Sequence, residues 1–222
     1  MREIVLDTET TGLDPASGDR IVEIGCVELI NHVATGETYH AYVNPERDMP
    51  QAAFEVHRLS EEFLKGHPVF AKVAEDFVQF IDTAPLIIHN AEFDMKFINA
   101  ELERAGCPPV AMSRTIDTLL LARRKFPGAP ASLDALCRRF NVDLSDRTQH
   151  GALIDARLLA EVYLGLSGGR QPGLGLAVGA QQKGVVSAER VSRPARPHSA
   201  SAAELAAHEE FVATLTDPVW KH

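Results

Sequence analysis

Two carboxylates at the end of an apolar stretch are the first residues that could do chemistry. Asp7 and Glu9 follow Ile4-Val5-Leu6 and stand two positions apart. Side chains of a strand alternate between its faces, so both carboxylates should lie on one face. The negative charges of the two carboxylates repel each other. A divalent cation that prefers oxygen ligands would compensate these charges. The following Thr10-Thr11-Gly12 supplies hydroxyls and a permissive backbone where a nucleotide could approach.

A third acid, Asp94, stands near the start of a predicted helix. Phe97, Ile98 and Leu102 follow it at helical spacing, which places Asp94 on or beside the face directed at a sheet. A buried carboxylate without a partner is strongly unfavourable. The helix dipole also favours an acid at this end, but Glu92 could fill that role. A metal ion therefore explains Asp94 better.

A fourth acid interrupts the apolar face of a later helix. Asp155 shares that face with Leu158 and Leu159, where a carboxylate has no structural purpose. His150 comes five residues earlier, where the helix only begins, beside Gly151. We therefore expect the histidine at the rim of a site and Asp155 at its floor.

Three segments together resemble the motifs of the DEDDh exonuclease family. They are Asp7-Thr-Glu-Thr-Thr-Gly-Leu13, His89-Asn-Ala-Glu-Phe-Asp94 and His150-Gly-Ala-Leu-Ile-Asp155, and the resemblance covers about residues 1–166. It implies a ribonuclease H-like fold and 3′→5′ hydrolysis with two divalent ions, Mg²⁺ or Mn²⁺. Within the family the chain is most similar to proofreading exonucleases, which remove mismatched DNA 3′ nucleotides as 5′-monophosphates.

The resemblance also implies a role for each residue. Asp7, Glu9 and Asp155 would hold a metal ion that activates the attacking water. Asp7, with Asp94 acting through water, would hold a second that stabilises the leaving 3′ oxygen. His150 would take the proton of the water, since a histidine ordinarily titrates near pH 6.5. The substrate would be bound by Asp7, Glu9, Thr10, His57 and Asp155.

The segment around His57 departs from the family at one position. Val56-His57-Arg58-Leu59 resembles the segment whose histidine contacts the terminal nucleotide, but Arg58 stands where the family commonly has glycine. Two further polar residues, Asp117 and His89, are predicted to have structural roles. We expect Asp117, at a strand end, to hydrogen-bond behind the metal ligands, with a role as a metal ligand as the alternative. We expect His89 to be a structural hydrogen-bonding residue.

The elements that must position these residues alternate along the chain. Strand patterns occur at residues 4–6, 20–29 and 38–43, with a loop expected at 31–36, and again at 85–89 and 115–118. Helical patterns occur at residues 69–81, 93–105, 132–140 and 152–166. This order predicts an α/β domain over residues 1–166, a mixed five-stranded sheet flanked by helices.

Charge is spread unevenly along the chain. The net charge is −9 with histidine neutral, yet residues 171–203 carry four cations against one acid, Glu189. An acidic body binds polyanions poorly, because non-specific affinity for nucleic acid comes from Lys and Arg. We therefore expect metal ions or a partner protein to help hold DNA. Neither a bilayer-spanning apolar run nor a signal peptide is read, which predicts a cytoplasmic protein.

The last quarter of the chain has a different composition. Residues 167–203 are rich in Gly, Gln, Ser and Pro and predict a flexible linker. Within it, Gln171, Leu174 and Leu176 resemble the short peptides that dock in the sliding clamp; a plain Gly-rich linker is the alternative. Residues 204–222, weakly helical over 203–215 and containing Trp220, resemble the segment that binds the alpha subunit of DNA polymerase III. A frayed terminus is the alternative there.

Two other functions compete with proofreading of DNA 3′ ends. One is a DEDDh RNase of the RNA-maturation or oligoribonuclease type, which rates on mismatched DNA ends and on short RNA would separate. The other is an interaction module that has kept the fold and lost the chemistry. The presence of all five active-site residues argues against this second alternative.

Overall fold

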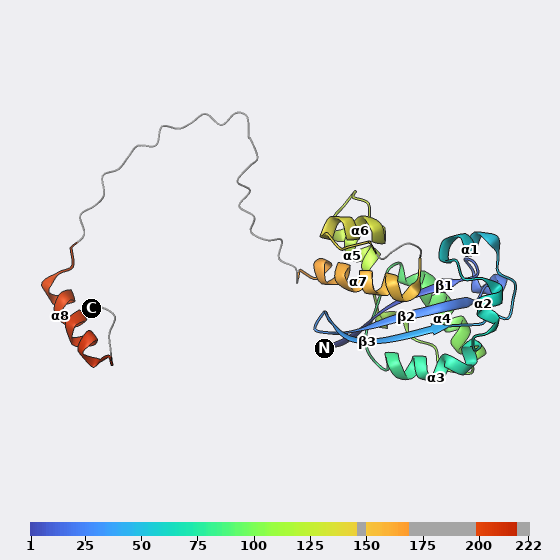
Figure 1. Cartoon of the computed structure of the whole chain (residues 1–222), viewed down its shortest axis with the longest axis horizontal. Coiled ribbons are helices and arrows are strands. Elements are labelled where there is room, and N and C mark those ends of the chain that lie inside the picture. The colour runs from blue at the N-terminus through green and yellow to red at the C-terminus, as the bar shows by residue number, and fades with distance from the viewer. Residues whose placement is uncertain (146–149, 169–198, 217–222) are drawn as a thin grey trace, which may run out of the picture. The chain divides into compact units, whose positions relative to one another are not determined.

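The apolar stretch near the start of the chain forms the central strand of a five-stranded sheet. In the computed structural model β1 spans Arg2–Thr10, and Ile4, Val5 and Leu6 are fully buried. The strand order is β3-β2-β1-β4-β5, and Figure 1 shows β3, β2 and β1 side by side. Strands β1, β2 and β3 are antiparallel, whereas β4 and β5 run parallel to β1, which confirms the predicted mixed sheet. The other strands are β2 Ile21–Ile30, β3 Val33–Tyr42, β4 Leu86–Ile88 and β5 Thr115–Asp117.

The structure describes residues 1–145, 150–168 and 199–216. The chain divides into two units, Met1–Gly175 and Leu176–His222. The expected boundaries at residues 166 and 203 stay predictions. The predicted partner-binding residues lie outside the described residues; they are Gln171, Leu174, Leu176 and Trp220.

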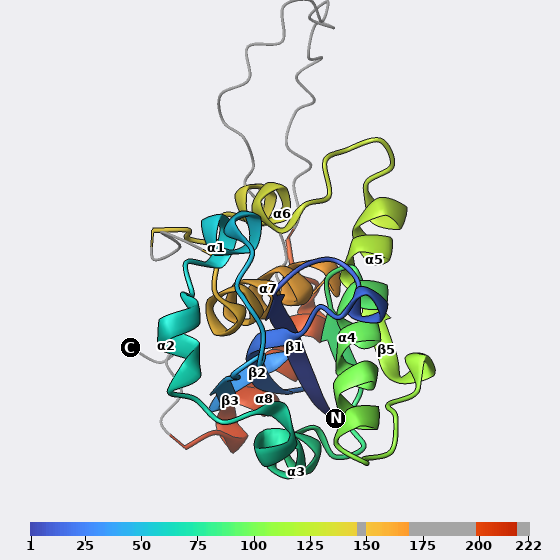
Figure 2. The same cartoon turned by 90° about the vertical axis from the view of Figure 1, so that its right-hand side faces the viewer.

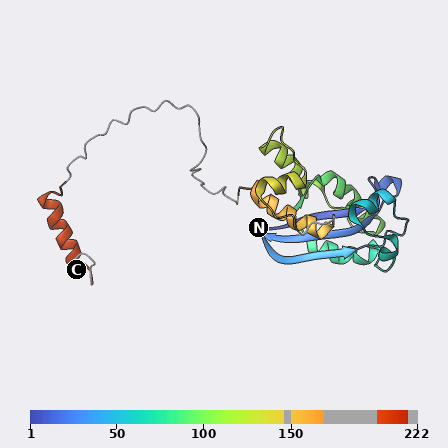
Figure 3. The same ribbon diagram turned by 45° about the horizontal axis from the view of Figure 1, so that its top comes forward.

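Helices cover both faces of the sheet in the first unit. On one face, α7 (Ala152–Leu166) packs against a cluster that includes Val5 of β1 (Figures 1 and 3). On the other, α3 (Phe70–Ile81) and α4 (Ala91–Arg104) pack against a cluster that includes Ile4 (Figure 2). Alternate residues of β1 therefore contribute to two cores, as the period-two alternation of a strand requires.

Two shorter helices extend the α7 layer. They are α5 (Thr118–Lys125) and α6 (Leu133–Phe140), and both contribute to a third apolar cluster with α7. Ser132 caps α6, because its side chain accepts a hydrogen bond from the backbone N–H of Ala135. The helices predicted at 132–140 and 152–166 are confirmed.

The connection between β2 and β3 is shorter than predicted. Only Asn31 and His32 form the turn, with φ of 52° and 67°, so the loop expected at residues 31–36 is wrong. Two successive left-handed residues match the twist of a hairpin. The first half of β3 is an exposed edge strand, so it lacks the apolar alternation from which a strand is predicted.

Three short α-helices were not predicted: α1 (Gln51–His57), α2 (Glu61–Lys65) and α5. In the second unit α8 spans Ala202–Thr214, close to the expected helix at 203–215. It begins with a capping box in which Ser201 and Glu204 bind each other's backbone N–H groups. Within the described ranges, no helix has both the length and the apolar character needed to cross a bilayer.

Candidate active site

The first two carboxylates lie on the face of the sheet that α7 covers. Asp7 pairs across the sheet with Gly25 of β2, and Glu9 pairs with Glu23. Both acids share the face of Val5, which belongs to the α7 cluster. Asp7 and Glu9 are half-buried, at the end of β1 where the covering helix begins.

Gly25 brings the start of α7 onto the sheet. A Cβ atom at Gly25 would lie 2.2 Å from the backbone nitrogen of Leu153, in the first turn of α7. Only a residue without a side chain permits this approach. Because Asp7 is opposite Gly25, the close contact also brings Asp155 toward Asp7. Sequence reasoning missed Gly25, although a glycine inside a strand pattern is a signal for close backbone approach.

Helix α4 delivers Asp94 to the same place from the other side. Asp94 is 3% exposed, and its Oδ1 accepts two hydrogen bonds from Thr8 of β1. The backbone N–H donates at 3.1 Å and the hydroxyl at 2.8 Å. Burial raises the pKa of Asp94 to about 7, although these hydrogen bonds act in the opposite direction.

His150 and Asp155 are hydrogen-bonded to each other. The Nδ1 atom of His150 lies 3.1 Å from Oδ2 of Asp155. The histidine side chain is 49% exposed and that of Asp155 only 6%, so the pair runs from the rim of the site to its floor. Gly151 follows His150 in an extended conformation and precedes α7, whose first turn carries Asp155.

Three of the predicted site residues lie close enough together to bind one metal ion. Glu9, His150 and Asp155 each offer one ligand atom, and these atoms all lie within 4.8 Å of one another. Asp7 lies beside them. Its pKa is raised well above the ordinary value, by burial first and then by Asp94, Glu9, Asp155 and Glu23.

Crowded carboxylates of this kind fit a divalent cation. Like charges that cannot separate must be protonated or compensated, and hard oxygen donors suit Mg²⁺ or Mn²⁺. Glu23 is a further carboxylate near Asp7, and it was not predicted as a residue of the site. It is 4% exposed and lies 2.7 Å from Nε2 of His40 on β3.

A pocket of about 580 Å³ adjoins the carboxylates; we call it the terminal pocket. It lies between the end of β1, helix α1 and Phe93, and Glu9, Thr10 and His57 line it. His57 is 2% exposed, and its Nδ1 accepts the backbone N–H of Leu59 at 3.1 Å. Burial lowers the pKa of His57, which favours a neutral imidazole at pH 7.

The loop after β1 is held by its own side chains. The hydroxyl of Thr10 donates to the carbonyl of Gly12 at 2.6 Å, and that of Thr11 donates to Asp19 at 3.2 Å. Asp19 lies so close to Gly12 that a Cβ there would stand 2.2 Å from its carboxylate. These hydroxyls, considered above for a nucleotide, are therefore used to shape the wall of the terminal pocket.

Arg58 has the backbone conformation that explains the family's preference for glycine. It ends α1 with φ of 61°, in the left-handed region, and its N–H donates to Phe54 at 2.8 Å. Glycine adopts this region without strain, whereas other residues lose roughly 1–2 kcal/mol. The guanidinium of Arg58 lies 5.9 Å from the centre of the Phe54 ring, so it folds back on its own helix.

Asp117 binds backbone amides. Its carboxylate caps α5 through the N–H groups of Leu119 and Leu120, and it also accepts those of Asn90 and Ala91 at the start of α4. Asp117 thereby holds the helix that carries Asp94. His89 lies 2.9 Å from the hydroxyl of Thr118, from Nδ1 to Oγ1, in the same junction.

The sequence of the chain is similar to those of known exonucleases. The model of a family described as "Exonuclease" matches residues 4–163. The DNA polymerase III subunit epsilon of Rickettsia prowazekii (strain Madrid E) is 59% identical over 174 residues, which cover 77% of this chain and 76% of the relative. This chain belongs to the exonuclease family. The subunit of the same name from Escherichia coli (strain K12) is 44% identical over 221 residues, covering 94% and 90% of the two chains.

Solved structures agree with this membership. Exonuclease X in complex with 5′ overhanging duplex DNA is 26% identical and covers 75% of this chain and 92% of its own, with a TM-score of 0.59. The nuclease domain of 3′hExo, a DEDDh family member bound to rAMP, shares the fold with a TM-score of 0.65 at 16% identity; the match covers 76% of this chain and 92% of that one. The predicted resemblance to the DEDDh exonucleases is confirmed, and divalent metal ions are implied for this exonuclease.

Proposed function

We propose that the protein is the proofreading 3′→5′ exonuclease, or epsilon, subunit of a bacterial DNA polymerase III. The observation that carries the proposal is the match to the Escherichia coli epsilon subunit over 94% of this chain. That match continues beyond residues 4–163, which the exonuclease family model covers. Relatives that act alone on nucleic acid need no such extension.

The residues of the site divide the work of hydrolysis. Two divalent ions, Mg²⁺ or Mn²⁺, when held by Asp7, Glu9, Asp94 and Asp155, would activate the attacking water and stabilise the leaving 3′ oxygen. The water oxygen attacks phosphorus and the bond to the 3′ oxygen breaks, so the product is a nucleoside 5′-monophosphate. Thr8 fixes the direction in which Asp94 points, through the two hydrogen bonds to its Oδ1.

His150 is the residue that we assign to proton transfer. Its contact with Asp155 orients the imidazole, and an Nδ1–H donated to that carboxylate makes Nε2 the basic nitrogen. Exposure at the rim of the site lets this nitrogen reach a water molecule. His57, held neutral by burial, would contact the terminal nucleotide in the terminal pocket, together with Thr10.

The second unit would connect the nuclease to its partners. Its helix α8 exposes Leu205 and Phe211, and Leu215 directly after the helix is also exposed; a partner surface could cover these apolar side chains. We assign residues 204–222 to binding of the polymerase alpha subunit and residues 171–176 to binding of the sliding clamp, with 167–203 as the linker between the two parts of the chain. Tethering would raise the local concentration of an acidic nuclease at a DNA 3′ end.

A comparison of substrates tests the proposal against an RNase of the same family. The full-length protein should release 5′-monophosphates from a mismatched DNA 3′ end at least about 10-fold faster than from a short RNA, a difference of roughly 1.4 kcal/mol. The same reactions with EDTA provide the control. A protein that degrades the RNA faster would be an RNase, and one that releases no nucleotide with Mn²⁺ present would be an idle interaction module.

A further inference from the structure

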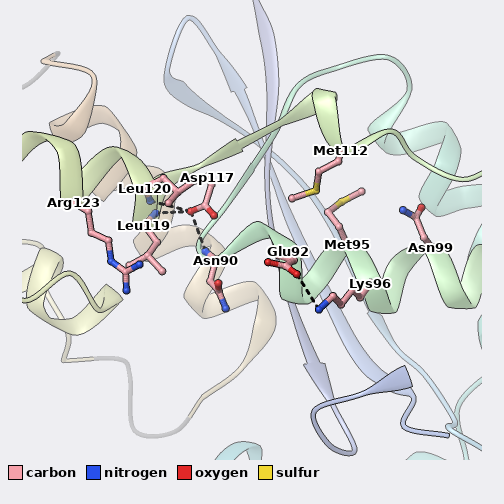
Figure 4. Close-up of a pocket in the computed structure, with 10 residues that line it drawn as sticks. All are labelled: Asn90, Glu92, Met95, Lys96, Asn99, Met112, Asp117, Leu119, Leu120 and Arg123. Carbon is pink, nitrogen blue, oxygen red and sulfur yellow. Dashed lines mark hydrogen bonds and ion pairs between the residues drawn. The ribbon is translucent and has the colours of Figure 1, made fainter. Parts of the chain in front are cut away.

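A second pocket lies beyond the first turn of α4. It has a volume of about 770 Å³ and lies between α4 and α5, where β4 and β5 end (Figure 4). Asn90 and Glu92 line this α4–α5 groove, whereas Phe93 lines the terminal pocket. Neighbouring residues of one helical turn, the turn that carries Asp94, thus border both cavities. The groove is within the size range of ligand pockets, roughly 300–1,000 Å³.

The charges of the groove leave one cation available. Asp117 accepts backbone N–H groups from the starts of both helices, so its charge is already compensated. Glu92 forms an ion pair with Lys96 at 3.0 Å. Arg123 is exposed on the last turn of α5 and, among the described residues, has no acidic partner. The guanidinium of Arg123 is therefore available to bind a phosphate of a polyanion in the groove.

The segment that forms one side of the groove, residues 118–140, is positively charged, unlike the chain as a whole. Although the net charge is −9, residues 118–140 contain five cations and a single acid, Asp134. Lys125 is occupied, because its Nζ donates to the carbonyls of Gly165 and Leu166. These cations are clustered in sequence over α5 and α6, and clustered positive charge in an acidic protein is typical of a region that contacts phosphates. The five cations are Arg123, Arg124, Lys125, Arg138 and Arg139.

Apolar and amide groups complete the groove. Met112 and Leu120 are 48% and 47% exposed, and Met95 is buried beside them. Such flexible apolar surfaces can pack against any base without reading its edge. Asn90 has φ of 69°, and its side chain makes no hydrogen bond that caps α4. Figure 4 shows its amide pointing away from Asp117, and this amide could donate to a phosphate oxygen.

We propose that the α4–α5 groove binds the nucleotides on the 5′ side of the scissile bond in a single strand. Arg123 and Asn90 contact their phosphates, and Met112 and Leu120 contact their bases. This inference rests on the proposed function, because a strand cut from its 3′ end must continue past the carboxylates, away from the terminal pocket. Glu92, which lines the groove, lies on the same first turn of α4 as Asp94, so the groove begins within one helical turn of this carboxylate.

Two substrates separate this groove from the catalytic centre. Thymidine 5′-(4-nitrophenyl phosphate) presents a terminal nucleotide whose leaving group replaces the rest of the strand, so it cannot reach the groove. A single-stranded DNA of six nucleotides, a length of about one binding site, can fill both cavities. With Mn²⁺ and the full-length chain, Arg123→Ala should raise KM for the DNA about 10-fold, and Arg123→Glu should raise it further. Hydrolysis of the ester should stay within about twofold of wild type for both variants.

Salt dependence gives a second readout for the same variants. The slope of log(1/KM) for DNA against log salt concentration should become shallower by about 0.7 in Arg123→Ala, the value for one phosphate contact on a single strand. Lys72→Ala, an exposed lysine on α3 that lines neither the groove nor the terminal pocket, is the matched control and should leave both KM and slope unchanged.

Three results would overturn the proposal. In the first, Arg123→Glu cleaves single-stranded DNA with the KM of wild type while both substrates are hydrolysed. In the second, only a primer–template duplex is affected, which would assign the groove to the template strand. In the third, the variants slow hydrolysis of the ester as much as that of DNA, which would make Arg123 a structural residue. A wild type inactive on both substrates would instead refute the proposed function and this inference with it.

Discussion

Individual residues show how far spacing alone predicts chemistry. Asp7 and Glu9 share one face of β1, as the period of a strand requires, and Asp94 is buried against that strand. Glu23 could not be recognised in the same way. A lone acid in an alternating strand pattern has the signature of a solvent-facing residue, and only its pairing with Glu9 across the sheet places it at the site.

Asp94 should make the stability of the metal-free protein depend on pH. Its folded pKa is about 7, above the ordinary 3.8, so the folded state binds more protons than the unfolded state between these values. The contribution of Asp94 is therefore most favourable below pH 3.8 and is lost as the pH rises toward 7. In EDTA, urea unfolding should give a free energy that falls between pH 5 and pH 8.

Asp94→Asn supplies the control for this prediction, because its amide does not titrate. The variant should show a weaker fall in stability over the same pH range. Added Mn²⁺ should stabilise the wild type more at pH 8 than at pH 5, since metal ions bind the ionised carboxylates. A metal-free wild type that becomes more stable as the pH rises, by the same amount as the variant, would contradict the raised pKa.

Elements with a complete core were predictable, and short or exposed elements were not. The helix at 152–166 has the predicted bounds, because it packs along its whole length and starts after Gly151. Helix α1 has seven residues and α2 five, too few to show a helical period, and the first half of β3 is exposed. Tertiary contacts, which the sequence does not display locally, decide these segments.

The contact between β2 and α7 predicts a severe effect of a single methyl group. Gly25→Ala would place a Cβ 2.2 Å from backbone atoms of α7, so the helix must move away from the sheet. We expect a loss of about 1–3 kcal/mol in urea unfolding, with a fall in turnover because Asp155 moves with the helix. Gly66→Ala is the control, since its Cβ would meet only Phe63 at an ordinary 3.5 Å. Equal stability of the two variants would refute the close packing.

At the scale of the whole molecule, the chain combines a nuclease with a separate second unit. The cores that α7, α3 and α4 form with the sheet lie within Met1–Gly175, and α8 lies in Leu176–His222. Composition predicted the change of character after residue 166. The polymerase and the sliding clamp stay proposed partners that rest on resemblance, because the four residues assigned to them lie outside the described ranges.

Truncation after Gly168 should separate the two activities. The shortened chain keeps all five proposed catalytic residues and the cores around them, so its release of nucleotides from single-stranded DNA should stay within about threefold of full length. Co-purification with a bacterial DNA polymerase III alpha subunit should be lost. Retained binding of the polymerase by the truncated chain would assign the interaction to the nuclease unit.

The central claim is that His150 and the surrounding carboxylates hydrolyse DNA from its 3′ end. The most direct measurement is the single-turnover rate of 5′-monophosphate release from a mismatched DNA 3′ end with Mn²⁺, for wild type and His150→Ala. His67→Ala, a histidine outside the candidate site, serves as control. Removal of a general base predicts a loss of at least about 10²-fold for His150→Ala alone, with an unfolding midpoint in urea close to that of wild type. A rate for folded His150→Ala near that of wild type would contradict the account.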